Sequence, residues 1–168
     1  MGLDMYLKRL PKVETNEQVD ELISFESGDV DRLVEHGKRL NENFDVERHL
    51  TLPEDWFPYG WAGKEVGYWR KANHIHRWFV ENVQGGMDEC VPHIVTKEKI
   101  EELLDAAKSA TNPRTAGEVL PTQSGFFFGG TDYDDYYFED NKNTVKILEE
   151  VLADTDFEKE SIFYVSSW

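Results

Sequence analysis

The side chains best suited to chemistry gather in residues 67–79, GYWRKANHIHRWF. This segment combines three cations with two histidines and several large aromatic rings, in a chain whose formal net charge is −16. A basic segment in so acidic a chain either receives an anionic ligand or is neutralised by the chain's own carboxylates. These two outcomes lead to different functions, and the sequence leaves both open.

A helix over residues 64–83 would bring these cations together. Its apolar positions recur at about 100° per residue, which leaves Arg70, His74, Arg77 and Glu81 on the opposite face. Two guanidinium groups about one turn apart could bind a phosphate or a carboxylate, with His74 between them as a donor or proton carrier. The competing interpretation pairs Arg77 with Glu81, and Arg70 with an acid from the C-terminal third. The 34 carboxylates of the chain favour it.

Two small polar residues, Gln123 and Ser124, could complete such an anion site. They lie in the sequence PTQSG just before the aromatic run FFF, where they would line the mouth of a pocket. A turn with local hydrogen bonds is the commoner role of such residues. The ligand of this alternative is a phosphate-like or nucleotide-like anion, and the protein would then be a small-molecule binder or an enzyme.

No metal, cofactor or catalytic residue is predicted. On a helix His74 and His76 point about 200° apart, so they cannot hold one ion, and we expect His76 to be a buried, hydrogen-bonded residue on the apolar stripe. Cys90 is the only cysteine and offers neither a disulfide nor a thiolate metal site. The chain also contains no nucleophile elbow and no phosphate-binding lysine loop.

Acidic residues are densest at Asp132, Asp134, Asp135, Glu139 and Asp140. Residues 131–160 carry 11 acidic and 3 basic side chains, a net charge of −8 that is half of the total of −16. Such a surface can occupy a basic groove of another protein, as a nucleic acid would, with fast and salt-sensitive association. Two plainer interpretations stay open: stabilisation by the dipole of the helix that begins here, and a solvated face that maintains solubility.

The excess of negative charge argues against several classes of partner. Direct binding of nucleic acid is driven by lysine and arginine at the phosphates, and anionic lipid surfaces attract basic segments. No apolar stretch approaches the roughly 20 residues that cross a bilayer. The single cysteine and the lack of a basic-then-apolar leader predict a cytoplasmic protein. We therefore expect a protein partner with a basic surface, and neither direct nucleic acid nor a membrane.

The elements that must position these residues form a mixture of helices and strands. Residues 1–168 are predicted to form a single α+β domain, with a mainly antiparallel sheet of about four strands and four to five helices. Strands are expected at residues 3–7, 91–95, 124–130 and 162–168, and helices from Thr15, over residues 29–40 and 64–83, and from Thr96 and Thr131. Residues 44–63, rich in proline and aromatics, are expected to be an ordered loop.

Several strings resemble a family of small bacterial and bacteriophage proteins. They are MGLDMYL at the start, GYWRKAN at residues 67–73, PTQSGFFFG at 121–129, YFED at 137–140 and SSW at 166–168. The resemblance spans nearly the whole chain and brings no catalytic residues. It implies a cytoplasmic protein of a phage-infected or bacterial cell, often carried on mobile DNA.

The leading hypothesis is a non-enzymatic interaction protein that binds, and inhibits, a host protein through its acidic surface. Mimicry of nucleic acid toward a defence or DNA-binding protein is one form of that activity. The anion-binding site described above is the alternative. A homo-oligomer formed through the aromatic loop between Trp56 and Trp61 also stays open.

Overall fold

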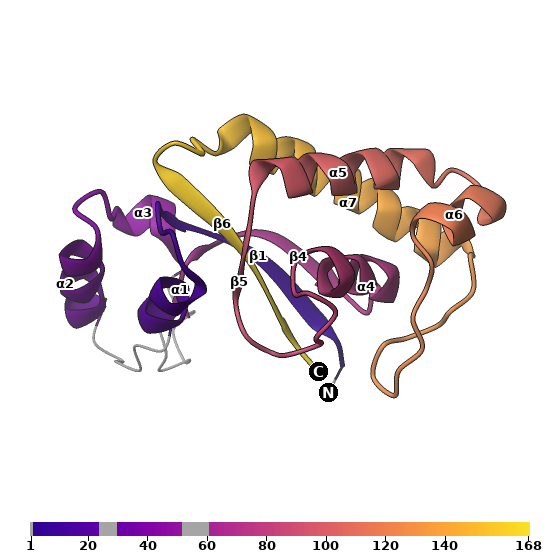
Figure 1. Ribbon diagram of the computed structural model, residues 1–168, viewed down its shortest axis with the longest axis horizontal. Coiled ribbons are helices and arrows are strands. Elements are labelled where there is room, and N and C mark those ends of the chain that lie inside the picture. Colours follow the sequence, from indigo (N-terminus) through magenta and orange to yellow (C-terminus); the bar gives the residue numbers. More distant parts are fainter. Residues whose placement is uncertain (1, 24–29, 52–60) are drawn as a thin grey trace.

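The computed structural model describes residues 2–23, 30–51 and 61–168, and its centre is a four-stranded antiparallel sheet (Figure 1). The strand order is β4-β1-β6-β5. These strands are β1 (Asp4–Pro11), β4 (Lys64–Arg70), β5 (His93–Val95) and β6 (Glu160–Ser167), and β2 (Leu50–Thr51) pairs separately with β3 (Trp61–Ala62). The predicted α+β class with about four antiparallel strands is confirmed.

Seven helices occur in the described residues, against the four to five that were predicted. They are α1 (Asn16–Ile23), α2 (Val30–Leu40), α3 (Val46–His49), α4 (Asn73–Asn82), α5 (Lys97–Ser109), α6 (Pro113–Val119) and α7 (Asp135–Asp154). The short helices α3 and α6 were not expected. Asn112 begins α6, because its side chain accepts hydrogen bonds from the amides of Arg114 and Thr115.

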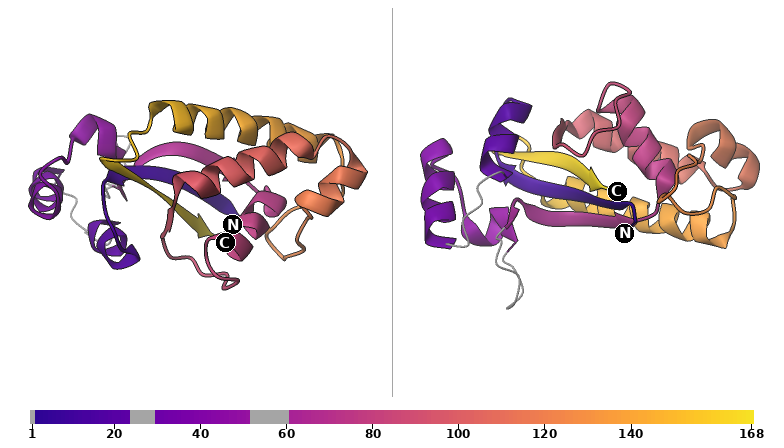
Figure 2. Two further views of the ribbon diagram at one scale, coloured as in Figure 1. Left: turned by 45° about the horizontal axis from the view of Figure 1, so that its top comes forward. Right: turned by 90° about the horizontal axis from the view of Figure 1, so that it is seen from below.

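The two ends of the chain meet in the middle of the sheet. Strand β1 pairs with β6 on one side and with β4 on the other, so Asp4 lies opposite both Ser167 and Arg70. The described N-terminal end and the C-terminus therefore lie side by side in every ribbon view (Figures 1 and 2). These pairings close long loops, which makes the sheet the element that ties the chain together.

The larger core lies between one face of the sheet and helices α4, α5 and α7. Leu3, Met5 and Leu7 alternate along β1 and are fully buried against these helices. Trp69 of β4 belongs to the same core, where its indole Nε1 donates to Oγ1 of Thr144 on α7 at 2.9 Å. Helices α5 and α7 lie side by side over this core (Figure 2).

A smaller core lies at the other end of the sheet, beside α1. Its buried members are Leu10, Val13, Val19, Leu50 and Phe163. The start of α1 carries the predicted capping pair: Thr15 Oγ1 accepts from the Gln18 amide at 3.3 Å, and Gln18 Oε1 accepts from the Thr15 amide at 3.3 Å. The strand over residues 3–7 and the helix from Thr96 are confirmed as well, whereas the helix predicted from Thr131 begins only at Asp135, because Asp134 caps it.

The helix predicted over residues 64–83 is wrong in its first half. Residues 64–70 form β4, in which buried Gly67 and Trp69 alternate with exposed Tyr68 and Arg70. Lys71 then takes a left-handed φ of 60° and turns the chain into α4. Pairing with β1, which lies some 60 residues away in sequence, outweighs the helical period because tertiary context overrides local propensity.

The strand predicted over residues 124–130 is also wrong, because these residues form a loop between α6 and α7. Residues 52–60, which carry most of the aromatic loop proposed as an oligomer interface, lie outside the described residues. No helix in the described part of the chain is both long enough and apolar enough to cross a bilayer.

Candidate functional site

A cavity of about 430 Å³ opens where α7 begins, and it collects most of the acidic cluster. Asp134 fixes where the helix begins, and so where these acidic residues lie, because its side chain caps α7 by accepting a hydrogen bond from the Tyr137 amide at 3.1 Å. The cavity lies between the start of α4, the end of β4 and the two ends of the loop before α7. Its lining residues are Arg70, Lys71, Asn73, His74, Thr122, Gly129, Gly130, Asp132, Asp134, Tyr136, Tyr137, Glu139 and Asp140.

The acidic residues of 131–160 divide into a paired half and an unpaired half. Toward the C-terminus, Glu149 pairs with Lys108, Glu150 with Lys146, Asp156 with Lys159, and Asp154 and Glu160 with arginines. Within the described residues, no cation lies within 4.0 Å of the five carboxylates in residues 132–140. The uncompensated negative charge is therefore concentrated at the beginning of α7.

Asp140 lies in a partly buried environment close to other carboxylates of this cluster. Burial raises the pKa of the Asp140 carboxyl to about 6, and the nearby carboxylates of Glu139 and Asp134 contribute to the rise. Arg70 and Lys71 line the same cavity, yet they do not offset this effect. The cavity wall is thus short of positive charge even in the presence of two cations.

The five residues of the predicted anion site do not converge. Arg70 lies on β4 and pairs with Asp4 at 3.4 Å, while Arg77 lies on α4 and pairs with Glu81 at 2.8 Å. Of the five, Arg70 and His74 line the cavity. The predicted site required Arg70 to lie on the same helix as His74, but residues 64–70 form a strand. The pairing of Arg77 with Glu81 is confirmed.

His74 is buried and uncharged at neutral pH. Its Nε2 lies 3.2 Å from Oδ1 of Asn141, and its ring packs on Tyr137. Burial lowers the pKa of His74 to about 4, although the hydrogen bond with Asn141 opposes the shift. A neutral imidazole adds little to the binding of an anion.

Gln123 and Ser124 are not among the residues that line the cavity. The Gln123 amide donates to Oδ1 of Asn73 at 2.9 Å, and Ser124 is exposed in the loop. His76 is the buried, hydrogen-bonded residue that was expected: its Nδ1 lies 2.7 Å from the hydroxyl of Tyr164 and its Nε2 lies 3.1 Å from Oδ2 of Asp88.

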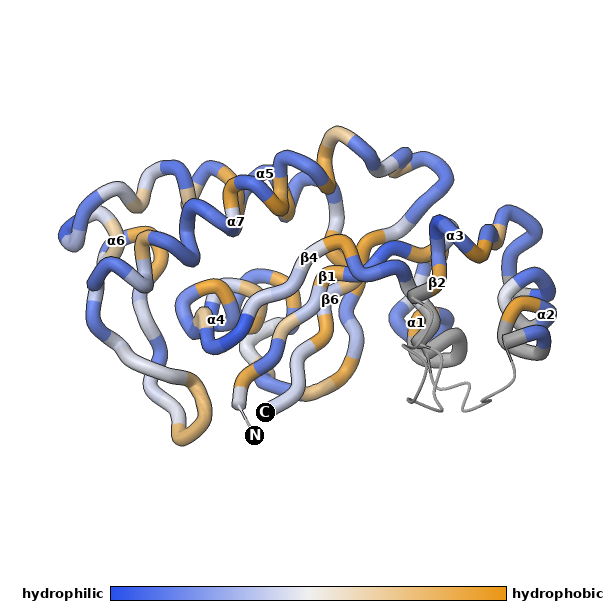
Figure 3. The backbone as a smooth tube through the Cα atoms, turned by 180° about the vertical axis from the view of Figure 1, so that it is seen from behind, coloured by the Kyte–Doolittle hydropathy of each residue, from blue (hydrophilic) through white to orange (hydrophobic). Residues whose placement is uncertain are grey.

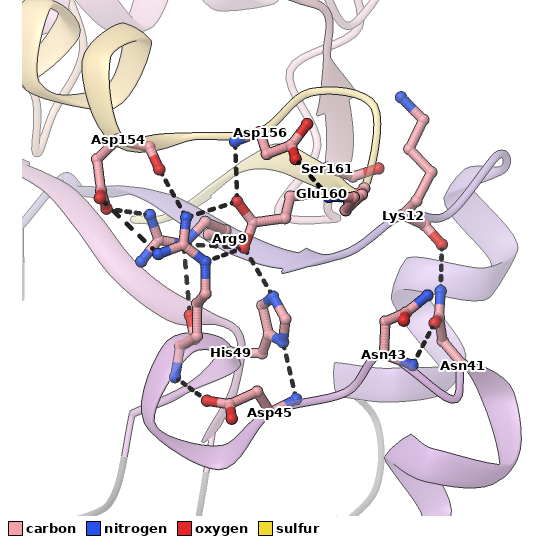
Figure 4. Close-up of polar contacts among 12 residues, drawn as sticks. Arg9, Lys12, Asn41, Asn43, Asp45, His49, Asp154, Asp156, Glu160 and Ser161 are labelled. Atoms are coloured by element: carbon pink, nitrogen blue, oxygen red, sulfur yellow. Dashed lines mark hydrogen bonds and ion pairs between the residues drawn. The ribbon is translucent and has the colours of Figure 1, made fainter.

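A second polar cluster, not anticipated from the sequence, joins α3 to β1 and β6 (Figure 4). Glu160 is 3 % exposed, and both of its carboxylate oxygens are used. Oε1 accepts from Nε of Arg48 and, at 3.0 Å, from Nε2 of His49. Oε2 accepts from Nη2 of Arg48 at 2.8 Å and from the Asp156 amide at 3.0 Å.

The protonation states of this cluster follow from its contacts. Burial by itself would raise the pKa of Glu160, but the hydrogen bonds from Arg48, the Asp156 amide and His49 lower it to about 2. Burial lowers the pKa of His49, and its hydrogen bond to Glu160 offsets part of that shift. Since Glu160 has four donors already, the cluster connects elements and leaves no carboxylate oxygen for a ligand.

One signal in the sequence could have revealed this cluster. Arg9 continues the inward period of Leu3, Met5 and Leu7 on β1, and a charged group at such a position requires a buried partner. Arg9 forms an ion pair with Asp154 and lies 3.8 Å from Glu160. Among residues 2–23, 30–51 and 61–168, no group of three or more His, Cys, Asp or Glu is arranged to hold a metal ion.

Comparison with protein-family models, with curated proteins and with solved structures gave no match to this chain. The candidate site is therefore defined by its own geometry: an acidic cavity at the beginning of α7, bordered by the loop of residues 121–131.

Proposed function

We propose that this protein binds a basic surface of another protein through the carboxylates of residues 132–140, without catalysing a reaction. The resemblance to bacteriophage proteins suggests a host protein as the partner and its inhibition as the result. A partner that normally binds nucleic acid would meet in this surface a similar array of negative charge. Such a protein would act in the bacterial cytoplasm.

The observation that carries the proposal is the division of the acidic residues. The dipole of α7 can account for the carboxylates of Asp134 and Asp135 at the start of the helix, but it falls off within the first turn and does not account for Glu139 and Asp140. Toward the C-terminus, cations pair with Glu149, Glu150, Asp154, Asp156 and Glu160, while the acids of 132–140 have no ion-pair partner among the described residues. Unpaired carboxylates held close together cost stability, and a cationic partner would recover that cost on binding.

The cavity adds a specific feature to this surface. Four of its lining side chains are carboxylates and two are tyrosines, of which Tyr136 is 79 % exposed. Carboxylates bind guanidinium and ammonium groups, and aromatic faces attract the same cations. A lysine or arginine side chain of the partner therefore fits the cavity better than an anion does. The anion-binding alternative has less support because its cations do not converge.

The first experiment measures capture and affinity with a charge-neutralised variant. Asp132→Asn, Asp134→Asn and Asp135→Asn are combined, since asparagine keeps the size of aspartate and still caps α7. The matched control removes three exposed carboxylates elsewhere, through Glu17→Gln, Asp105→Asn and Glu158→Gln. A protein that the wild-type chain captures from a host-cell lysate is purified, and its affinity for each chain is measured at two salt concentrations.

We expect the variant at residues 132–135 to weaken binding roughly tenfold or more and to reduce the salt dependence, because it removes the steering charges. The control should bind within about twofold of the wild type. Competition by duplex DNA would identify a nucleic-acid-binding partner. Equal loss in the two triple variants would show that only net charge matters and would contradict the proposed surface, as would the absence of any captured protein.

A further inference from the structure

The loop of residues 121–131, which borders the acidic cavity, is braced by one buried side chain. Asn73, at the first position of α4, contacts both limbs of the loop. Its Oδ1 accepts from the Gln123 amide at 2.9 Å, and its Nδ2 donates to the carbonyls of Phe128 at 3.1 Å and Gly130 at 2.7 Å. Both ends of this side-chain amide, the oxygen and the NH₂ group, thus hold the two limbs together.

Further contacts fix the tip of the same loop. The Phe128 amide donates to the Gly125 carbonyl at 3.2 Å and closes a tight turn, and the Leu3 amide of the chain start donates to the Phe127 carbonyl at 3.2 Å. A Cβ at Gly125 would lie 2.6 Å from the Phe128 ring, so only glycine fits there without displacing that ring. At the base, Thr122 Oγ1 donates to the Thr131 carbonyl at 2.9 Å.

The three consecutive phenylalanines of this loop have different environments. Phe128 is buried and its ring contacts His76 edge-on, at 5.1 Å between centroids. Phe127 is partly buried against the larger core. Phe126 is 95 % exposed, and its ring lies perpendicular to that of Phe127 at 4.8 Å. Figure 3 shows the apolar tip of this loop extending away from the helices and the sheet.

Ordering the backbone of this loop and exposing the Phe126 ring to water both cost free energy. Burial of Phe126 in the core does not offset that cost. Phe126 contributes almost no buried area to the core, so the fold gains little from a phenylalanine here. Interface hot spots, in contrast, are rigid aromatic side chains that enter a pocket of the partner and lose little conformational freedom on binding. The bracing by Asn73 and Thr122 provides that rigidity before binding.

We propose that Phe126 is the apolar anchor of the interface, and that it enters an apolar pocket on a partner whose basic side chains surround that pocket. This inference rests on the proposed function and specifies the chemistry of its partner. The charge complementarity comes from the same loop, because Thr122, Gly129 and Gly130 line the acidic cavity together with Asp132. Phe126 and Asp132 thus belong to one segment of the chain, with Phe126 near the tip of the loop and the acidic cavity at its base. A second copy of this chain is a poor occupant, since each copy carries a formal charge of −16.

The test compares three single variants against the purified partner captured by the wild-type chain. Phe126→Ala should weaken binding about thirtyfold or more, as expected for an aromatic hot spot. Phe126→Trp should retain most of the affinity, because it keeps a large ring. Met87→Ala removes another exposed apolar side chain, 62 % exposed and outside the loop, and should change the affinity less than twofold. Thermal unfolding of all three variants should match the wild type.

The salt dependence separates this inference from the proposed function. Phe126→Ala should leave the salt dependence of the affinity unchanged, whereas the triple variant at residues 132–135 should reduce that dependence. If Phe126→Ala binds with wild-type affinity while the triple variant loses binding, Phe126 is not an anchor, and the proposed role of the acidic surface is supported. If Phe126→Ala fails while the triple variant binds normally, the acidic surface is overturned and the apolar anchor remains.

Two further outcomes overturn the anchor. A concentration-dependent mass of the wild-type chain in light scattering that Phe126→Ala abolishes would identify a second copy as the occupant. A wild-type chain that captures no protein would remove both the proposed function and the anchor. Capture of an unidentified protein does not by itself support the proposed function or the anchor role of Phe126. The affinities of the variants for that protein test both claims.

Discussion

Nε2 of His49 donates a hydrogen bond to Oε1 of Glu160 at 3.0 Å, between residues that lie 111 positions apart in the chain. The direction of this bond is determined by the other ring nitrogen, because Nδ1 of His49 accepts from the Asp45 amide at 3.0 Å. His49 is therefore a neutral donor with both nitrogens engaged. Together with Arg48 it connects the short helix α3 to the last strand of the sheet (Figure 4).

Removal of the carboxylate at the centre of this cluster should destabilise the fold. Glu160→Ala leaves Arg9 and Arg48 without their shared buried partner, and we expect a loss of about 3–5 kcal/mol in the free energy of unfolding. Glu158→Ala, at a nearby exposed glutamate, should change that free energy by less than about 0.5 kcal/mol. Urea unfolding at pH 7 measures both. Equal values for the two variants would show that the buried cluster does not stabilise the protein.

His74 should make the protein less stable as the pH falls. Its pKa of about 4 in the folded protein lies below the ordinary value of 6.5, so the unfolded chain takes up the proton first. The stability is complete above pH 6.5 and is lost progressively down to pH 4, by up to about 3 kcal/mol. His74→Gln should remove this loss. His93→Gln, at a partly exposed histidine, should retain it in urea unfolding across this pH range.

Asp140 should act in the opposite direction over an overlapping pH range. Its folded pKa of about 6 lies above the ordinary value of 3.8, so the folded state binds the proton more tightly and gains stability as the pH falls from about 6 to 4. Asp140→Asn should therefore stabilise the protein at pH 7.5 by about 1–2 kcal/mol and remove that gain. Asp105→Asn, at an exposed site on α5, is the matched control. A destabilised Asp140→Asn protein would show that Asp140 has a cationic partner.

The brace of the loop before α7 can be removed by one substitution. Asn73→Ala leaves two carbonyls and one amide without their buried partner, which should cost about 2–4 kcal/mol. The amides of residues 122–130 should then exchange with solvent deuterium faster than in the wild type. Asn143→Ala, at an exposed position of α7, should alter neither the stability nor the exchange. Unchanged exchange in Asn73→Ala would mean that other contacts are sufficient to hold the loop.

Much of the fold was predictable from local patterns. The alternation of Leu3, Met5 and Leu7 predicts β1, and the capping residues Thr15 and Thr96 mark the beginnings of α1 and α5. The class of the fold followed from these elements. Residues 64–70 were misread because Trp69 fits an apolar helical stripe as well as a strand, and only the neighbouring β1 selects the strand.

The candidate site shows the same division between sequence and structure. That the acidic residues cluster at 132–140 and that the cations cluster at 70–77 is visible in the sequence alone. Which carboxylates have cationic partners depends on distances between elements far apart in the chain, such as Lys108 and Glu149 at 2.7 Å.

The α+β class, the excess of negative charge and the beginnings of α1 and α5 can be read from the sequence, because they depend on composition and on neighbours within a few residues. The separation of Arg70 from His74, the enclosure of Glu160 by Arg48 and His49, and the exposure of Phe126 depend on how distant segments pack. The reason is physical: burial and pairing energies depend on where the chain returns to itself, and long-range strand pairing sets that return.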